Sequence, residues 1–582
     1  MEDGRNENSP ETVEELFKEE KMKKIKERLL KIYTEHDVEE IFPELEQRIA
    51  ETIEKQLRKR KANWDEKDIV LITYADQFYK DEEAALSTFK KMYDNYFANV
   101  FEIVHLLPFY PYSSDDGFSV IDYKGVNPIN GDWKEVQRLS TSTRLMFDYV
   151  CNHISAKSEW FQEYLKNNNN YKDYFFEVDS TFNTTNVTRP RSTPLLTTFE
   201  LENREKKNVW TTFSEDQIDL NFRNPKVLME MIDVLLFYIE QGAEYIRLDA
   251  VGFMWKEDGT TCMHLEKTHE LIKLFRNVVD LTSKGTVIIT ETNVPHLDNI
   301  SYFGNGHDEA HMVYQFPLPP LILYSLFKAD GTELSEWAKN LDTTSSNTTY
   351  FNFLASHDGI GLNPLKGIIE ENNILELVKH LEKEGALVSY KNNPDGSVSP
   401  YEVNVTYLDA LNHAADEDTI RIKRFMLAHS ILLTLPGVPA IYVQSILGSR
   451  NYLAGVSETG MNRTINREKH NYSKLVNELS DSKTLRNKIY HQLSNVISAR
   501  KNEPLFHPTI PMKVRDFGSS LFVIERNAEN DEKILVIHNL TNEEQQCSLA
   551  GTYKDVLTGK EIKSSDTFKL EAYQFLWLKN IN

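Results

Sequence analysis

The sequence predicts a (β/α)8 barrel that carries an N-terminal helical extension, a small domain inserted after the third strand, and a C-terminal antiparallel β domain. Three observations lead to this fold class. Short β-branched or aromatic runs alternate with amphipathic helical stretches, which is typical of βα units and a parallel sheet. Eight such runs are present, and acidic residues stand at the ends of several. After about residue 505 the pattern changes to short alternating strands.

Residues 1–66 form the predicted extension. Apolar residues recur there at helical spacing among many Glu and Lys, and Pro10 and Pro43 punctuate the pattern. The first residues are polar and acidic and lack the apolar core of a signal peptide. No apolar run approaches the roughly 20 residues that span a bilayer. We therefore expect a cytoplasmic protein without a membrane partner.

The barrel is predicted in two parts, residues 67–153 and residues 223–504. The strand candidates begin as apolar runs and turn polar at their ends. This is expected when the strands pack a barrel interior and its C-terminal face carries the chemistry. The eight candidates are residues 68–76, 102–110, 144–153, 243–251, 286–293, 311–316, 349–358 and 438–446.

The connection between the third and fourth strands is far longer than a βα unit requires, and it contains the Pro-rich segment TRPRSTPLL. This length predicts an inserted small domain at residues 154–222. A second long excursion is expected at about residues 370–420. Residues 505–582 form the predicted C-terminal β domain.

The net charge of the chain limits the classes of partner that it can bind. The chain has 66 Lys and Arg against 89 Asp and Glu, a net charge of −23, which repels nucleic acid and anionic membranes. We expect small-molecule substrates instead, and the sequence leaves the oligomeric state open. Cys151, Cys262 and Cys547 are widely spaced and are predicted to be reduced structural thiols.

Four acids, Asp148, Asp249, Glu291 and Asp358, stand at the ends of predicted strands. Each alone is equally well a paired structural acid, but together on the C-terminal face of a barrel they favour catalysis. Arg247 lies two residues before Asp249 on one strand, so the two side chains share a face and can pair, which favours an ionised nucleophile.

Glu291 follows the apolar run VIIT, whose surroundings should raise its pKa and keep a proton available. This suits a general acid. A nucleophile and an acid with carboxyl groups about 5–5.5 Å apart would define a retaining mechanism through a covalent glycosyl-enzyme.

The motifs DYVCNH, IRLDAVG, ITETN and FLASHD resemble the four signature regions of the α-amylase superfamily of glycoside-active enzymes. HLLPFYPYSSDDGFSVIDY, YQFPLPPL and LPGVPAIY resemble its sucrose phosphorylase branch, over nearly the whole chain from residue 65 to 580. GSRN followed by NRTINREK, together with HLEKTH and GDW, is similar to the glucosylglycerate phosphorylases. Phe253 stands where the sucrose enzymes commonly carry Tyr.

The resemblance implies a retaining phosphorylase that converts 2-O-α-D-glucosyl-D-glycerate and phosphate to α-D-glucose 1-phosphate and D-glycerate. It implies Asp249 as nucleophile, Glu291 as acid/base, and Asp358 as the carboxylate that braces the transition state. It implies that the glucosyl unit is bound by Asp115, Phe118, His153, Arg247 and His357. Phosphate would be bound by Arg191 and Arg463. An extra arginine in the acceptor loop, Arg450, is our candidate for the acceptor carboxylate.

Other interpretations stay open. A histidine at a strand end is often a core residue, the TRPR segment can be a stiff loop, and NRTINREK can cap a helix. The function can also be that of a sucrose or sucrose 6'-phosphate phosphorylase, an α-glucosidase hydrolase, or an inactive barrel used for binding. We expect no cofactor and no metal, because the spare carboxylates of a hard-cation site are not evident beside Asn152.

Overall fold

Eight parallel strands close into a barrel in the order β1-β16-β12-β11-β10-β9-β4-β3, which confirms the predicted fold class. The structure is a computed structural model, and it describes residues 10–55, 57, 60–61, 64–341, 345–393, 397–528, 532–563 and 567–581. The barrel strands are β1 (Val70–Thr73), β3 (Ile103–Leu106), β4 (Arg144–Tyr149), β9 (Ala243–Leu248), β10 (Val287–Thr290), β11 (Met312–Tyr314), β12 (Thr349–Phe353) and β16 (Val438–Tyr442).

Every strand ends earlier than its predicted run, and β1, β3, β10 and β11 also begin one or two residues later. β16 ends at Tyr442 and the helix α14 (Val443–Ile446) follows at once. β12 ends at Phe353, so Asp358 lies in the loop beyond the strand and not at its tip. The polar ends of the predicted runs leave the sheet because they turn into the loops that line the cavity described below.

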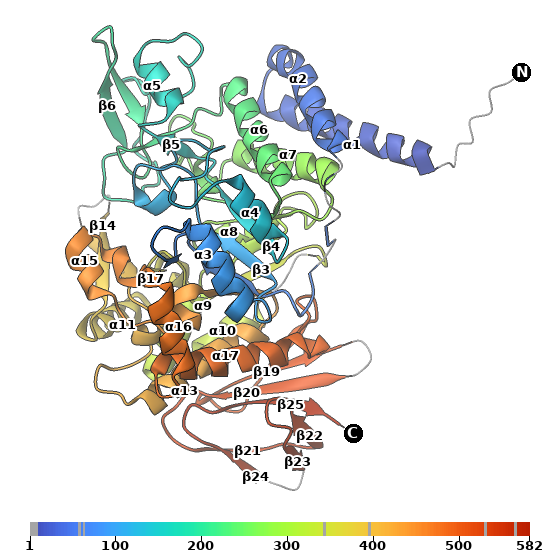
Figure 1. The fold of residues 1–582 in the computed structure, drawn as a ribbon, viewed down its shortest axis with the longest axis vertical. Helices are drawn as coiled ribbons and strands as arrows, with labels where there is room; N and C mark the ends of the chain where they lie inside the picture. Colours follow the sequence, from blue (N-terminus) through green and yellow to red (C-terminus); the bar gives the residue numbers. More distant parts are fainter. Residues whose placement is uncertain are drawn as a thin grey trace, which may run out of the picture.

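Helices on the outside of the barrel follow the strands in turn (Figure 1). The main ones are α3 (Ala85–Met92), α4 (Trp133–Ser140), α6 (Pro225–Glu240), α7 (Glu266–Thr282), α9 (Leu318–Lys328), α10 (Thr332–Lys339), α13 (Asp418–Thr434), α16 (Tyr472–Ser480) and α17 (Leu485–Lys501). Short helices in the connections are α8 (His296–Ile300), α12 (Tyr407–Ala410) and α15 (Leu453–Thr459). None of the helices in the described residues is long and apolar enough to cross a membrane.

The N-terminal extension is a helical hairpin, α1 (Pro10–Ile32) and α2 (Glu35–Glu54). Thr34 caps α2 by a reciprocal pair of hydrogen bonds with Asp37. The apolar stripe of α2 is buried, and the hairpin packs on α7 and α6 of the barrel. Arg48 fixes this contact, with Nε 2.5 Å from Asp233 and Nη1 2.8 Å from Glu240 on α6. Residues 1–9 of the predicted extension lie outside the described residues.

Two insertions rise from the barrel on the side of the strand carboxyl ends. The first follows β4 and contains β5 (His153–Ser155), α5 (Glu159–Leu165), β6 (Leu196–Glu200), β7 (Lys206–Trp210) and β8 (Gln217–Asp219). The second follows β12 and builds a three-stranded sheet in the order β13-β15-β14. Its elements are β13 (Ile360–Gly361), α11 (Glu371–Lys383), β14 (Leu387–Asn392) and β15 (Val398–Asn404).

The C-terminal domain is an antiparallel sheet in the order β18-β19-β20-β25-β22-β23, with a separate pair β21-β24. The strands are β18 (Met512–Arg515), β19 (Leu521–Asn527), β20 (Lys533–Asn539), β21 (Gln545–Ser548), β22 (Thr552–Asp555), β23 (Glu561–Lys563), β24 (Thr567–Leu570) and β25 (Phe575–Asn580). Buried Trp577 attaches the sheet to the barrel, because its Nε1 donates to Ser430 Oγ of α13 at 2.9 Å.

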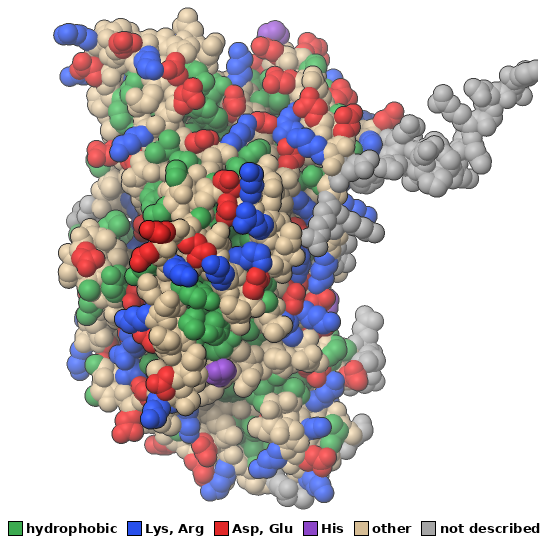
Figure 2. Space-filling model, viewed as in Figure 1, with side chains coloured by type: hydrophobic (Ala, Val, Ile, Leu, Met, Phe, Trp, Pro, Cys, Tyr) green, Lys and Arg blue, Asp and Glu red, His purple; other side chains and the backbone are tan. Residues whose placement is uncertain are grey.

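Charged side chains of both signs are interspersed over the face shown in Figure 2. A surface of this kind has no large field of one sign on that face. The three cysteines are buried and form no disulfide.

Candidate active site

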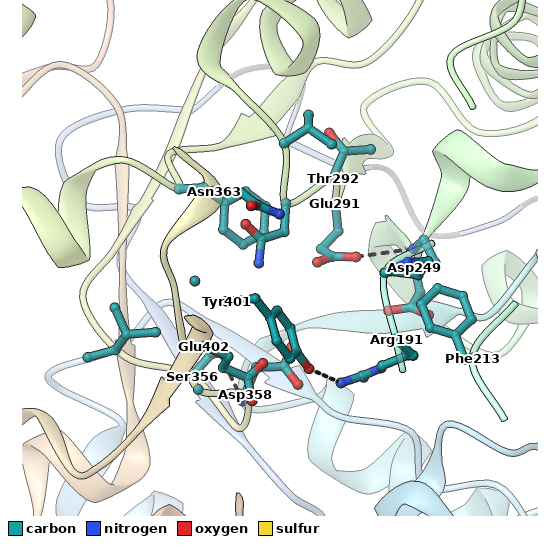
Figure 3. Close-up of a pocket in the computed structure, with 18 of the residues that line it drawn as sticks. Arg191, Phe213, Asp249, Glu291, Thr292, Ser356, Asp358, Asn363, Tyr401 and Glu402 are labelled. Atoms are coloured by element: carbon teal, nitrogen blue, oxygen red, sulfur yellow. Dashed lines mark hydrogen bonds between the residues drawn. The ribbon is translucent and has the colours of Figure 1, made fainter. Parts of the chain in front are cut away.

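A cavity of about 630 Å³ opens at the carboxyl ends of the barrel strands (Figure 3). Its walls come from the strand ends, from the insertion after β4 and from the insertion after β12. Nine of the predicted site residues line it, namely Asp115, Phe118, His153, Arg191, Asp249, Glu291, His357, Asp358 and Arg463.

Arg247 holds two carboxyl groups together at the base of the cavity. Its Nη1 is 2.7 Å from Asp249 Oδ1, and its Nη2 is 3.7 Å from Glu291 Oε2. Behind it, Nη1 also contacts buried Asp148, whose other oxygen is 2.6 Å from His105 Nε2. Asp148 and His105 therefore fix the position of the arginine, and the predicted pairing of Arg247 with Asp249 is confirmed.

Burial raises the pKa of both Asp249 and Glu291, because desolvation disfavours the charged form. The two carboxyls share one guanidinium, so a proton taken up here belongs to the pair. Arg247 lies closer to Asp249 than to Glu291, which favours the negative charge on Asp249, whereas burial acts against it and raises the pKa of Asp249 well above its usual value. The predicted rise in the pKa of Glu291 is confirmed.

Asp358 faces this pair from the opposite side of the cavity (Figure 3). Burial alone would raise the pKa of Asp358, but the charges of Arg463 and Arg467 outweigh burial and hold its pKa well below the usual range. Arg463 Nη1 is 2.5 Å and Arg467 Nη2 is 3.9 Å from Asp358 Oδ1. Asp358 is therefore a stable negative charge in the cavity.

Flat and polar side chains line the side of the cavity next to Asp358. Phe118 stacks on His357, with ring centroids 4.7 Å apart and planes inclined by 8°. Burial lowers the pKa of His153, and that of His357 to about 3, so both rings are neutral near pH 7. Asp115 accepts a hydrogen bond from Gln217 at 3.1 Å. An aromatic platform beside neutral imidazoles and a carboxylate suits a sugar ring and its hydroxyls.

The two arginines predicted to bind phosphate have different surroundings. Arg463 is occupied, because its Nε and Nη2 lie 3.0 and 2.7 Å from the two carboxylate oxygens of Glu402. Arg191 donates to the hydroxyl of Tyr401 and lies over the ring of Phe213. It pairs with no carboxylate among the described residues. Of the two, Arg191 is the one whose charge is open to an anion.

The structure does not bring Arg450 together with the other predicted site residues. This arginine is absent from the described residues that line the cavity, and its side chain is half-exposed. Its guanidinium pairs with Asp409, which also accepts the backbone N–H of Asn451 at 2.7 Å.

Several cavity residues were missed by the sequence analysis. The insertion after β12 supplies Tyr401, Glu402 and Lys391. Asn293 lies two residues after Glu291 in the same loop. No strand-end pattern marks the first three, because their sheet lies outside the barrel. Arg467, which lies behind the lining, contacts Asp116 and the carbonyl oxygen of His357, and its signal was its place in the NRTINR segment.

The side chain of Asn152, considered above as a possible metal ligand, contacts a lysine. Lys256 Nζ lies 3.3 Å from Asn152 Oδ1 and 2.7 Å from Asp219 Oδ2. Among the residues that the structure describes, no three His, Cys, Asp or Glu side chains are grouped so that they could hold a metal ion.

A closed parallel barrel with two carboxyls on one arginine, and a third carboxylate across the cavity, defines a glycoside-active enzyme of the α-amylase class. In agreement, the family model "Alpha amylase, catalytic domain" matches residues 96–373. The chain is 53% identical over 523 residues to a glucosylglycerate phosphorylase of Escherichia coli (strain K12), covering 90% of this chain and 93% of that protein.

A sucrose phosphorylase of Agrobacterium vitis is 29% identical, over 79% of this chain and 93% of that protein. The crystal structure of sucrose 6F-phosphate phosphorylase from Thermoanaerobacter thermosaccharolyticum matches with a TM-score of 0.72 at 23% identity, over 87% of this chain and 98% of that one. This structural likeness supports the fold. The chain belongs to the glucosylglycerate phosphorylase family, within the sucrose phosphorylase branch that its motifs indicated.

Proposed function

We propose that this protein is a retaining phosphorylase that converts 2-O-α-D-glucosyl-D-glycerate and inorganic phosphate to α-D-glucose 1-phosphate and D-glycerate. The relative from Escherichia coli is named for this substrate and type of reaction. The observation that carries the proposal is the placement of Asp249 and Glu291 on one guanidinium, in a cavity that also presents Arg191.

In the first step, the Asp249 carboxylate attacks the anomeric carbon while Glu291 protonates the glycosidic oxygen, and glycerate leaves. The charge arrangement supports these roles, because Arg247 favours the anion on Asp249 and burial keeps the proton on Glu291. Asp358 remains ionised and stabilises the positive charge that develops on the sugar ring.

In the second step, a phosphate oxygen attacks the anomeric carbon of the glycosyl-enzyme from the side that glycerate has left. The bond between that carbon and Asp249 breaks and frees the carboxylate, and Glu291 accepts the proton of phosphate. Two inversions restore the α configuration. The guanidinium of Arg191 suits a phosphate oxygen, since arginine presents a planar fork of donors. Arg463 can also bind phosphate if its hydrogen bonds to Glu402 are broken.

We also propose that the enzyme works without a metal. The ammonium of Lys256 lies between Asn152 and Asp219, so a side-chain cation balances the carboxylate there. A hard cation would need several more oxygen ligands at this place.

Product analysis tests the proposed function. The protein is incubated with 2-O-α-glucosylglycerate, with sucrose and with sucrose 6'-phosphate, each with and without phosphate, and the products are read by proton NMR. We expect α-glucose 1-phosphate from the glucosylglycerate only when phosphate is present. Free glucose formed at the same rate without phosphate would identify a hydrolase. Preference for either sucrose substrate would identify the corresponding phosphorylase.

A further inference from the structure

Two lysines lie in the wall of the cavity formed by the insertion after β12. Lys391 on β14 places its Nζ 3.3 Å from Asn363 Oδ1 and is partly buried, while Lys366 lines the same wall and is exposed. Neither lysine forms an ion pair with a carboxylate of the described residues. They differ in this respect from Arg463 and Lys256, whose charges are neutralised by Glu402 and Asp219.

The positive charge of the two lysines in this wall is not balanced by a carboxylate of the described residues. Burial and the positive charge of Lys366 lower the pKa of Lys391. An ammonium that is partly desolvated beside a second ammonium is unfavourable until an anion binds between or beside them. A ligand carboxylate would relieve both effects at once.

The lysine wall lies next to the loop of the general acid. The side chain of Asn293, two residues after Glu291, fills the space that a Cβ atom on Gly361 would occupy. Asn363, which contacts Lys391, follows Gly361 by two residues, and Figure 3 places it on the side of the cavity away from Arg191. Lys391 is therefore connected to the loop of Glu291 through Asn363 and Gly361, and its contact Asn363 lies away from Arg191.

We propose that Lys391, with Lys366 beside it, binds the carboxylate of the departing acid and so selects an anionic acceptor. The inference rests on the proposed function. In glucosylglycerate the carboxylate carbon is bonded to C2, whose oxygen is the glycosidic oxygen that Glu291 protonates. The carboxylate must therefore sit beside the acid loop, to which Lys391 is connected through Asn363 and Gly361. Asn293 Oδ1, buried without a hydrogen-bond partner in the described chain, can accept from the hydroxyl of the same acceptor.

The test uses the reverse reaction, in which glucose 1-phosphate donates glucose either to D-glycerate or to glycerol, and released phosphate is measured. Lys391→Met keeps the length of the side chain and removes its charge. We expect kcat/KM for D-glycerate to fall by about tenfold to a hundredfold, the loss of one charge-assisted hydrogen bond, with little change for glycerol. Lys391→Arg should restore part of the preference for D-glycerate.

Two controls separate this role from others. Lys383→Met removes an exposed lysine of α11 in the same insertion and should keep the preference for D-glycerate. Arsenolysis of glucose 1-phosphate, which needs no acceptor, should be unchanged in Lys391→Met. Equal losses in arsenolysis and in transfer to D-glycerate would assign Lys391 to phosphate and overturn the inference.

The outcomes also distinguish the inference from the proposed function. If the wild-type protein transfers glucose to D-glycerate no better than to glycerol, the proposed function fails and the inference fails with it. If the wild type prefers D-glycerate and Lys391→Met keeps that preference, only the inference is wrong.

Discussion

Arg247 contacts Asp148, Asp249 and Glu291, so one guanidinium pairs with three carboxyl groups of the site. Its pairing with Asp249 was predictable because residues two apart on a strand share a face. The partner of Arg450 was not predictable in the same way, since Asp409 lies far away in the chain and only the folded loops bring the two together. Local spacing identified the acids that line the cavity but not which loop arginine joins them.

The raised pKa of Glu291 leads to a prediction about pH. The first step needs the protonated acid, and a raised pKa extends this form to higher pH, so kcat/KM for glucosylglycerate should fall as pH rises through the folded pKa. That fall should lie above the ordinary glutamic acid value of about 4.3. Glucosyl fluoride, whose leaving group needs no proton, should show no such alkaline fall in single-turnover kinetics, and an identical fall would contradict the role of Glu291.

Because Arg191 and Arg463 have different surroundings, we expect their substitution by alanine to have different effects. Arg191→Ala should lower phosphorolysis by about one to two orders of magnitude and raise the ratio of glucose to glucose 1-phosphate, because only the phosphate step loses a donor. Arg463→Ala should also slow formation of the glycosyl-enzyme, because Asp358 and Glu402 lose their partner. Product ratios at fixed phosphate and single-turnover rates measure the two effects. An unchanged ratio in Arg191→Ala would remove that residue from the phosphate site.

At the scale of elements, the sequence predicted all eight barrel strands but not where they end. An apolar run is visible in sequence because it packs the barrel interior, as in β16 and β12. The residues that leave the sheet do so to reach the cavity, and no local propensity marks that point. The sheet formed by β13, β15 and β14 was expected only as a long excursion, because its strands are short and partly polar.

The helical hairpin α1–α2 is predicted to stabilise the barrel without taking part in the reaction. Leu45 of α2 is fully buried at the contact with the barrel, so Leu45→Ala should lower the free energy of unfolding by about 2–5 kcal/mol. Leu30 of α1 is 45% exposed, so Leu30→Ala serves as the matched control with little effect. Chemical denaturation measures both. A loss of kcat with unchanged stability in Leu45→Ala would show that the hairpin acts on the site.

At the scale of the whole molecule, the net charge of −23 opposes the arrival of anionic substrates. Raising the ionic strength from about 0.01 M to about 0.1 M shortens the Debye length from roughly 30 Å to roughly 10 Å and screens this long-range repulsion. We expect kcat/KM for phosphate to rise over that range, in stopped-flow or initial-rate measurements with a monovalent salt. A steady decrease would mean that attraction by the lysines of the cavity wall outweighs the long-range repulsion of phosphate by the net charge.

The insertion after β12 supplies Tyr401, Glu402 and both lysines from one continuous stretch, residues 360–404, while Asp249 and Glu291 follow the barrel strands β9 and β10. With the roles proposed above, bond chemistry and the choice of acceptor are encoded in different parts of the chain. A lineage could exchange this stretch and acquire a new leaving group while inheriting the same glucosyl transfer, and a protein engineer could graft it as a cassette for the same purpose.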